Sequence, residues 1–125
     1  MYQIDFDEDK SLIRLKLAGF WDADIATRFS AEFLAKAAEV GRNGRIVSVL
    51  GDGRELPVQS AEVSEVFGKL MDDMSRAVGG RVAIITATTL NRLQAQRIFH
   101  GQKFQVFDEP VAAEAWALEG IPSRS

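Results

Sequence analysis

The feature that most constrains the fold is a long amphipathic segment between two short apolar ones. Residues 63–78 place apolar side chains at i, i+3, i+4, i+7, i+8, i+11 and i+15, which makes one continuous stripe along a helix. The segments 46–50 and 81–86 have the length and composition of buried strands. A strand, a helix and a strand in this order predict a parallel pair of strands with a right-handed crossover, and therefore an α/β fold.

The start of the chain has the two-residue period of strands. Residues 2–6 and 13–17 alternate apolar and polar side chains on either side of a polar turn at 8–10, which predicts an antiparallel β-hairpin. The polar face is acidic on the first strand and basic on the second, and opposite charges across an antiparallel pair stabilise it. One face of this hairpin is therefore expected to be buried and the other to face water.

Capping residues and glycines divide the rest of the chain into further elements. The expected order is β-β-α-β-α-β-α-β-α, with a mixed, largely parallel sheet of about five strands and helices that cover both of its faces or wrap around them. Breaker residues predict a loop at 51–57. The remaining expected elements are a helix from an N-cap at Asp22 to Gly41, a helix from Ser60 to about 78, a helix from Thr88 or Thr89 to about His100, a strand at 104–107, and a helix from Asp108 to Gly120.

Length and composition narrow the class of protein. The chain has 125 residues and a net charge of −3, which fits one domain (1–120) with a short tail (121–125) and disfavours nucleic acid as a partner. It has no cysteine, so thiolate chemistry and disulfides are excluded. Because no apolar run reaches the ~18 residues of a membrane span and residues 1–10 lack a secretory signal, we expect a cytoplasmic protein.

The C-terminal segment carries a family resemblance. Phe104-Gln105-Val106-Phe107-Asp108-Glu109-Pro110 leads into Ala113-Glu114-Ala115-Trp116-Ala117-Leu118, after a leading hairpin and alternating strands and helices. This arrangement resembles the SpoIIAA-like group, also labelled STAS/SEC14-like, which is related to anti-sigma factor antagonists. The resemblance implies a SpoIIAA-like (STAS-type) single α/β domain. It also implies a non-catalytic regulatory or protein-interaction module whose biochemical role is unassigned.

Ser60 is the candidate phosphorylation site that this resemblance implies. In anti-sigma factor antagonists, the serine of an Asp-Ser-(Ser)-Gly motif at a helix start is phosphorylated by a partner kinase. Here the corresponding segment is Pro57-Val58-Gln59-Ser60-Ala61-Glu62, without the preceding Asp or the following Gly. A phosphate there would meet the unpaired N–H groups of a helix start. The simpler interpretation is that the Ser60 hydroxyl only caps the helix.

No residue pattern predicts a catalytic site, a metal site or a cofactor. Gly51-Asp52-Gly53-Arg54 follows a strand, where α/β sheets bind ligands, but a single Gly-x-Gly is more often a plain turn. His100 is the only histidine, and no nucleophile elbow or second metal ligand accompanies it. Its position at a helix end is typical of a side chain that complements the helix dipole.

The third helix carries a candidate partner surface. Basic and amide side chains gather there in an otherwise acidic chain, and such a patch could receive an acidic or phosphorylated partner protein or a second copy of this chain. The alternative is a solvated helix face. Phe99 is expected to lie partly outward, since the apolar residues of this helix form no single stripe. The surface comprises Arg92, Gln96, Arg97, Phe99, His100 and Lys103.

The first two helices carry a candidate ligand pocket. Their phenylalanines and methionines recur at helical spacing, so they face inward. They could line a cavity for a small lipophilic ligand, which makes a carrier or sensor the alternative function. Phe and Met stripes more often form plain core. The pocket residues are Phe29, Phe33, Phe67, Met71 and Met74.

Overall fold

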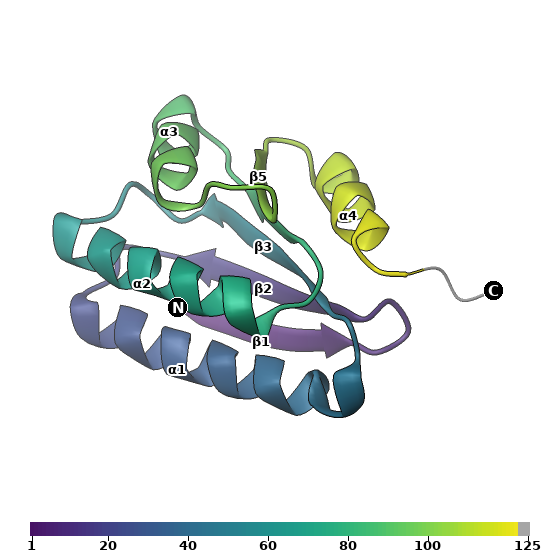
Figure 1. Ribbon diagram of the computed structural model, residues 1–125. Coiled ribbons are helices and arrows are strands. Elements are labelled where there is room, and N and C mark those ends of the chain that lie inside the picture. The colour runs from purple at the N-terminus through teal and green to yellow at the C-terminus, as the bar shows by residue number, and fades with distance from the viewer. Residues whose placement is uncertain (123–125) are drawn as a thin grey trace.

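The computed structural model of the chain describes residues 1–122 and contains the predicted order of elements. One sheet has the strand order β1-β2-β3-β4-β5 (Figure 1). β1 and β2 form the predicted antiparallel hairpin, and β2 to β5 pair in parallel. The strands are β1 (Tyr2–Asp7), β2 (Leu12–Ala18), β3 (Ser48–Glu55), β4 (Val82–Ile85) and β5 (Phe104–Phe107). The helices are α1 (Ala23–Val40), α2 (Ala61–Ala77), α3 (Thr89–Ile98) and α4 (Pro110–Glu119), with a 3-10 turn at Arg42–Gly44.

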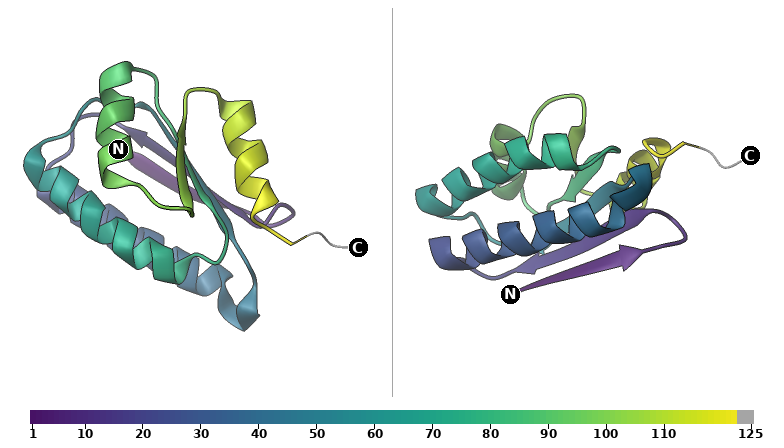
Figure 2. Two further views of the ribbon diagram at one scale, coloured as in Figure 1. Left: turned by 45° about the horizontal axis from the view of Figure 1, so that its top comes forward. Right: turned by 60° about the horizontal axis from the view of Figure 1, so that its bottom comes forward.

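Helices cover both faces of the sheet, as the alternation predicted. α1 and α2 lie side by side on one face, and α4 lies on the other (Figures 1 and 2). Each face has its own apolar core. The larger core joins β2, β3 and β4 to α1 and α2, whereas the smaller one joins Leu12, Leu50 and Ile85 to two alanines of α4. α3 stands apart from α1 at the β5 side of the sheet (Figure 2).

The larger core is organised around Trp21, which is 1% exposed. Its ring contacts Tyr2, Phe29 and Phe67 at centroid distances of 5.3–5.7 Å. Edge-to-face contacts of this kind add about 0.5–1.5 kcal/mol to the burial of each pair. This cluster joins the first strand to α1 and α2, so it holds the helix layer on the sheet.

The caps and ends of the helices match the sequence signals closely. Asp22, Ser60 and Thr88 accept hydrogen bonds from backbone N–H groups of the first turns of α1, α2 and α3. The last helix is capped by Glu109 rather than by Asp108, and Pro110 occupies its first turn. α3 ends at Ile98, two residues before His100, because the backbone leaves helical geometry at Phe99.

The loop predicted at 51–57 is wrong for residues 51–55. β3 continues to Glu55, and Gly51 and Asp52 pair with Ile84 and Ile85 of β4. Strands on both sides supply partners for this backbone, and that pairing outweighs the low strand preference of Gly and Asp. A Cβ at Gly53 would lie 3.2 Å from the Ile85 carbonyl oxygen, so a glycine here lets the two strands lie close together.

The C-terminal tail is described only for Ile121 and Pro122, and its residues 123–125 lie outside the described part of the chain. Within residues 1–122, every helix is too short or too polar to cross a bilayer.

Candidate functional site

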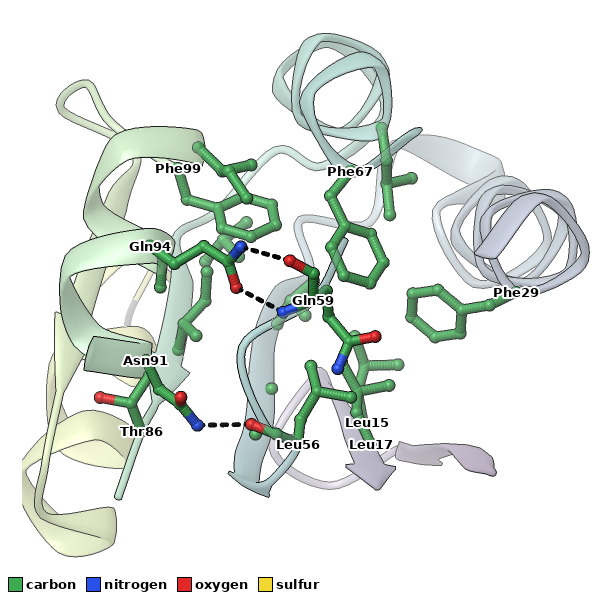
Figure 3. Close-up of a pocket in the computed structure, with 18 of the residues that line it drawn as sticks. Leu15, Leu17, Phe29, Leu56, Gln59, Phe67, Thr86, Asn91, Gln94 and Phe99 are labelled. Carbon is green, nitrogen blue, oxygen red and sulfur yellow. Dashed lines mark hydrogen bonds between the residues drawn. The ribbon is translucent and has the colours of Figure 1, made fainter. Parts of the chain in front are cut away.

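An apolar cavity of about 80 Å³ lies between the sheet, α2 and α3 (Figure 3). Its floor is the α2 side of β2, β3 and β4, and its walls are α2 and α3. The segment between β3 and α2 closes one end. Carboxyl ends of parallel strands are where α/β sheets usually bind ligands, and this cavity reaches that edge through Thr86 and Leu56.

The cavity includes three of the five predicted pocket residues. Phe29, Phe67 and Met74 line it, but Phe33 and Met71 do not. Phe33 lies one turn further along α1 and is fully buried in the core, and Met71 lies on the half-buried flank of α2. The prediction placed the pocket under α1 and α2, whereas the cavity lies under α2 and α3, with Phe29 as its contact with α1. The other apolar lining residues are Leu15, Leu17, Val49, Leu56, Pro57, Leu70, Val82, Ile84, Ala95, Ile98 and Phe99.

Gln59 joins two loops at the mouth of this cavity. Its side-chain oxygen accepts a hydrogen bond from the backbone N–H of Trp21 at 2.8 Å. Its side-chain nitrogen donates to the carbonyls of Pro57 at 2.6 Å and Gly19 at 3.2 Å. The side chain is buried and every polar atom in it has a partner, so it ties the β2–α1 and β3–α2 connections together.

α3 is held over the cavity by side-chain amides. Gln94 accepts from the backbone N–H of Gln59 at 2.9 Å and donates to its carbonyl at 3.0 Å (Figure 3). Its nitrogen also donates to the Ser64 hydroxyl at 3.1 Å, and the Asn91 nitrogen donates to the Leu56 carbonyl. No residue of α3 is fully buried. Hydrogen bonds to loop backbone therefore fix this helix, together with the half-buried Ile98 and Phe99.

Thr86 lies at the end of the cavity where β4 leads into α3. Its side chain is 5% exposed, and its hydroxyl has no hydrogen-bond partner. No other buried side-chain nitrogen or oxygen within residues 1–122 lacks a partner. Most buried hydroxyls have a hydrogen-bond partner, so Thr86 is an exception in the core of the described chain.

The predicted partner surface on α3 is only partly assembled. Gln96, Arg97 and His100 are exposed and Arg92 is half-buried. Phe99, expected to lie partly outward, is half-buried: its ring packs 6.3 Å from Phe67 and 6.1 Å from Phe104 and lines the cavity.

Lys103 is not part of this surface either. Its ammonium group donates to the carbonyls of Ser75 at 2.8 Å and Val78 at 2.6 Å, at the C-terminal end of α2. A cation is favourable there because the last carbonyls of a helix lack partners within it. Lys103 therefore fastens the end of α2 to the strand that follows α3.

Ser60 occupies the predicted helix start. Its hydroxyl accepts from the Val63 N–H at 3.2 Å, which is the geometry of an N-cap. The side chain is half-buried, directly after Gln59. The structure thus shows the capping role that the simpler interpretation assigned to this serine.

Ion pairs dominate the opposite face of the sheet. Arg14 and Lys10 bind Glu114 of α4 at 2.7 and 2.8 Å, and these hydrogen bonds lower the pKa of Glu114 to about 2. Arg54 likewise holds the pKa of Asp52 below its usual value through a hydrogen bond at 2.7 Å. No group of three His, Asp or Glu side chains within residues 1–122 is placed to hold a metal ion.

The amides around the cavity were not predicted from the sequence. One signal was present: Asn91, Gln94 and Gln96 make α3 the least hydrophobic helix, yet it follows a buried strand and must pack against something. Gln59 immediately precedes a helix cap, a position often filled by an apolar residue that packs on the first turns. A glutamine there indicates a hydrogen-bonding role.

These features define a class of protein: an α/β domain with a mixed five-stranded sheet, helices on both faces, and an apolar cavity at the carboxyl edge of the strands. No protein-family model matches the sequence, and no curated protein matches it. A crystal structure of an uncharacterised DUF3478-family protein with a SpoIIAA-like fold, from Shewanella loihica PV-4, superimposes with a TM-score of 0.68. The two are 21% identical, and the match covers 94% of this chain and 92% of that one. The chain therefore has the SpoIIAA-like fold.

Proposed function

We propose that this domain binds a small lipophilic molecule in the cavity between the sheet, α2 and α3, and acts as its carrier or sensor. The observation that carries the proposal is the cavity itself, which is almost wholly apolar and reaches the edge of the sheet where ligands of α/β proteins bind. Close-packed cores hold few spaces larger than one water molecule.

The volume limits the ligand. The cavity measures about 80 Å³, roughly half of the ~150 Å³ of an engineered apolar cavity that binds benzene or xenon. A molecule of a few carbon atoms therefore fits the closed structure. A long-chain lipid would require α3 to move outward, and α3 is the wall with the fewest buried residues.

A substitution that fills the cavity tests the proposal. Ala95 lines it from α3, and Ala95→Leu would place three more carbon atoms in the space. Ala115→Leu is the matched control, because Ala115 is an exposed residue of α4 on the other side of the sheet. In ¹H–¹⁵N spectra, xenon under pressure should shift amides of β3, β4 and α3 in the wild type and in Ala115→Leu, but not in Ala95→Leu. Identical shifts in all three, or none in the wild type, would contradict the proposal.

A second candidate is a regulatory contact with a protein partner through the outer face of α3. Leu90 and Leu93 are 69% and 49% exposed there, beside Arg97 and His100. Exposed apolar side chains next to basic ones fit an acidic amphipathic partner or a second copy of this chain. Sedimentation of the wild type, Leu93→Lys and Arg97→Glu at rising concentration tests the second copy. A wild type that stays monomeric would remove self-association from this candidate.

A further inference from the structure

We infer that the free edge of β1 pairs with the same edge of a second copy of this chain, so that two five-stranded sheets join into one continuous sheet. The surface is the outer edge of Tyr2–Asp7, and it lies at the opposite side of the sheet from β5 and α3. It is therefore separate from the outer face of α3, and its pairing does not depend on a ligand in the cavity.

β1 is open to such pairing. It is the terminal strand of the sheet, and in the right-hand view of Figure 2 it is the outermost element, beyond α1. Exposed edge strands usually carry a proline, a lysine or a bulge that blocks pairing with another chain. Residues 2–7 contain neither proline nor lysine, and they pair with β2 without a shift in register. The other edge strand, β5, has only four residues, whereas β1 has six.

The hydrogen bonds of the hairpin show which backbone groups of β1 point outward. Met1 and Ala18 exchange both of their backbone bonds, at 3.0 and 3.1 Å. Bonded and non-bonded pairs alternate along an antiparallel pair of strands, so the odd-numbered residues of β1 bond to β2. The N–H and C=O groups of the even-numbered residues therefore point away from β2, and no other strand of residues 1–122 lies beside them. These outward residues are Tyr2, Ile4 and Phe6.

One register of two antiparallel copies pairs all of these groups. Ile4 lies opposite Ile4 of the second copy and Tyr2 lies opposite its Phe6, so each outward N–H and C=O has a partner. The three apolar side chains then share the α1 side of the joined sheet. On its other side Gln3 lies opposite Asp5, and the amide can donate to the carboxylate. A shift of two residues in one direction places Asp5 against Asp5, and in the other direction it leaves Phe6 without a partner.

Charges beside the edge match in the same register. At one end of β1, the Tyr2 hydroxyl donates to the carboxylate of Glu32 on α1. At the other end, Phe6 borders a groove with three basic and two acidic side chains, and the Arg45 guanidinium lies 4.9 Å from the centroid of the Phe6 ring. Because Tyr2 of each copy lies opposite Phe6 of the other, Glu32 approaches the basic groove of the second copy on both sides of the two-fold axis. The edge is thus complementary to itself in backbone, apolar surface and charge.

Hydrogen exchange of single amides tests this surface. In ¹H–¹⁵N spectra, the amides of Ile4 and Phe6 should exchange quickly in a dilute solution of the wild type and become protected as its concentration rises. The amides of Gln3 and Asp5 bond to β2 and are the internal control, because they should be protected at every concentration. Sedimentation velocity over the same range measures the dissociation constant of the dimer.

Substitutions of the exposed Gln3 test the register. Gln3→Glu places a like charge opposite Asp5 of the second copy, whereas Gln3→Lys places an opposite charge there. Each change acts twice across the two-fold axis, so the first should weaken the dimer about fivefold and the second should strengthen it by a similar factor. Leu93→Lys, on the exposed face of α3, is the control and should leave the dissociation constant unchanged.

The outcomes separate this inference from the other proposals. A wild type that stays monomeric up to about 1 mM, or a dimer in which Ile4 and Phe6 remain unprotected, would show that the inference is wrong. If Leu93→Lys dissociates the dimer and Gln3→Glu does not, the contact lies on α3 instead. If Gln3→Glu and Gln3→Lys weaken the dimer alike, the register is wrong. None of these results bears on the cavity, which the xenon experiment tests by itself.

Discussion

Replacement of Gln59 by leucine should reveal how much of the stability of this domain depends on one buried amide. Leucine has a similar size and is apolar, so the change removes the hydrogen bonds of the side chain without opening a large space. Gln59 is 7% exposed, and Trp21, whose N–H it binds, is 1% exposed. Water therefore has little access to the Trp21 N–H that the substitution would leave unpaired, whereas Gly19 and Pro57 are exposed residues.

The expected loss follows from those groups. The Trp21 N–H and the Pro57 carbonyl would lose the partners that lie at 2.8 and 2.6 Å, and the Gly19 carbonyl would lose a weaker one at 3.2 Å. Each buried polar group without a partner costs about 1–3 kcal/mol. The Pro57 and Gly19 carbonyls belong to exposed residues and can bind water instead, so the Trp21 N–H dominates the loss, and we expect Gln59→Leu to lower the free energy of unfolding by about 1–3 kcal/mol.

Urea unfolding followed by tryptophan fluorescence measures this difference, since Trp21 lies beside the altered residue. Gln96→Leu is the matched control: Gln96 is an exposed residue of α3, and the same substitution there should change stability by less than about 0.5 kcal/mol. A loss below about 0.5 kcal/mol for Gln59→Leu, with an unchanged urea slope, would refute the reasoning that this amide holds the loops together.

Three further predictions concern other parts of the fold. A Cβ at Gly80 would overlap the Ser48 hydroxyl, so Gly80→Ala should destabilise the domain by about 1–3 kcal/mol. Gly68 lies in open space on α2, so Gly68→Ala should stabilise the domain by up to about 1 kcal/mol. The urea midpoints of the two variants and the wild type measure these changes. The pKa of Glu114 is about 2 in the folded chain against its usual 4.5, so its contribution is complete above pH 4.5 and is lost as the pH falls towards 2. Glu114→Gln should therefore lower stability at pH 7 and weaken its decline between pH 4.5 and 2, and parallel pH curves for variant and wild type would contradict this. Ser60→Ala should cost about 1 kcal/mol through loss of the α2 cap, while Ser60→Asp should stay within about 0.5 kcal/mol of the wild type by thermal melting.

The architecture could be predicted because it depends on periodicity and capping. These signals are local: the two-residue alternation of the hairpin strands, the apolar stripe of the second helix, and capping residues such as Asp22 and Ser60. Together they specify the order of elements and the parallel sheet. Residues 51–55 of β3 could not be predicted in this way. Gly51 and Asp52 disfavour strands locally, and only the neighbouring strands on both sides stabilise them there.

The cavity could be predicted only in part, for a related reason. Phe29, Phe67 and Met74 reveal their inward direction by helical spacing, but spacing does not show which of them border an empty space. That space depends on where α3 lies, and α3 is fixed by Gln94 and Asn91, which bind backbone groups 35 residues away in sequence. Amide side chains pair with almost any backbone group, so their partners leave no pattern in the sequence.

The same contacts make α3 the element on which both candidate functions depend. Its inner side closes the cavity with Ile98 and Phe99, and its outer side presents Leu90 and Leu93. Amide hydrogen bonds rather than fully buried side chains hold α3, so displacing it exchanges those bonds for bonds to water, while the apolar wall of the cavity becomes exposed. A ligand larger than the cavity can shift α3 only if it binds the displaced arrangement more tightly than the closed one. A ligand that is too large for the cavity would have to break the hydrogen bonds between Gln94 and Gln59, and the outer face of α3 would then move with the helix.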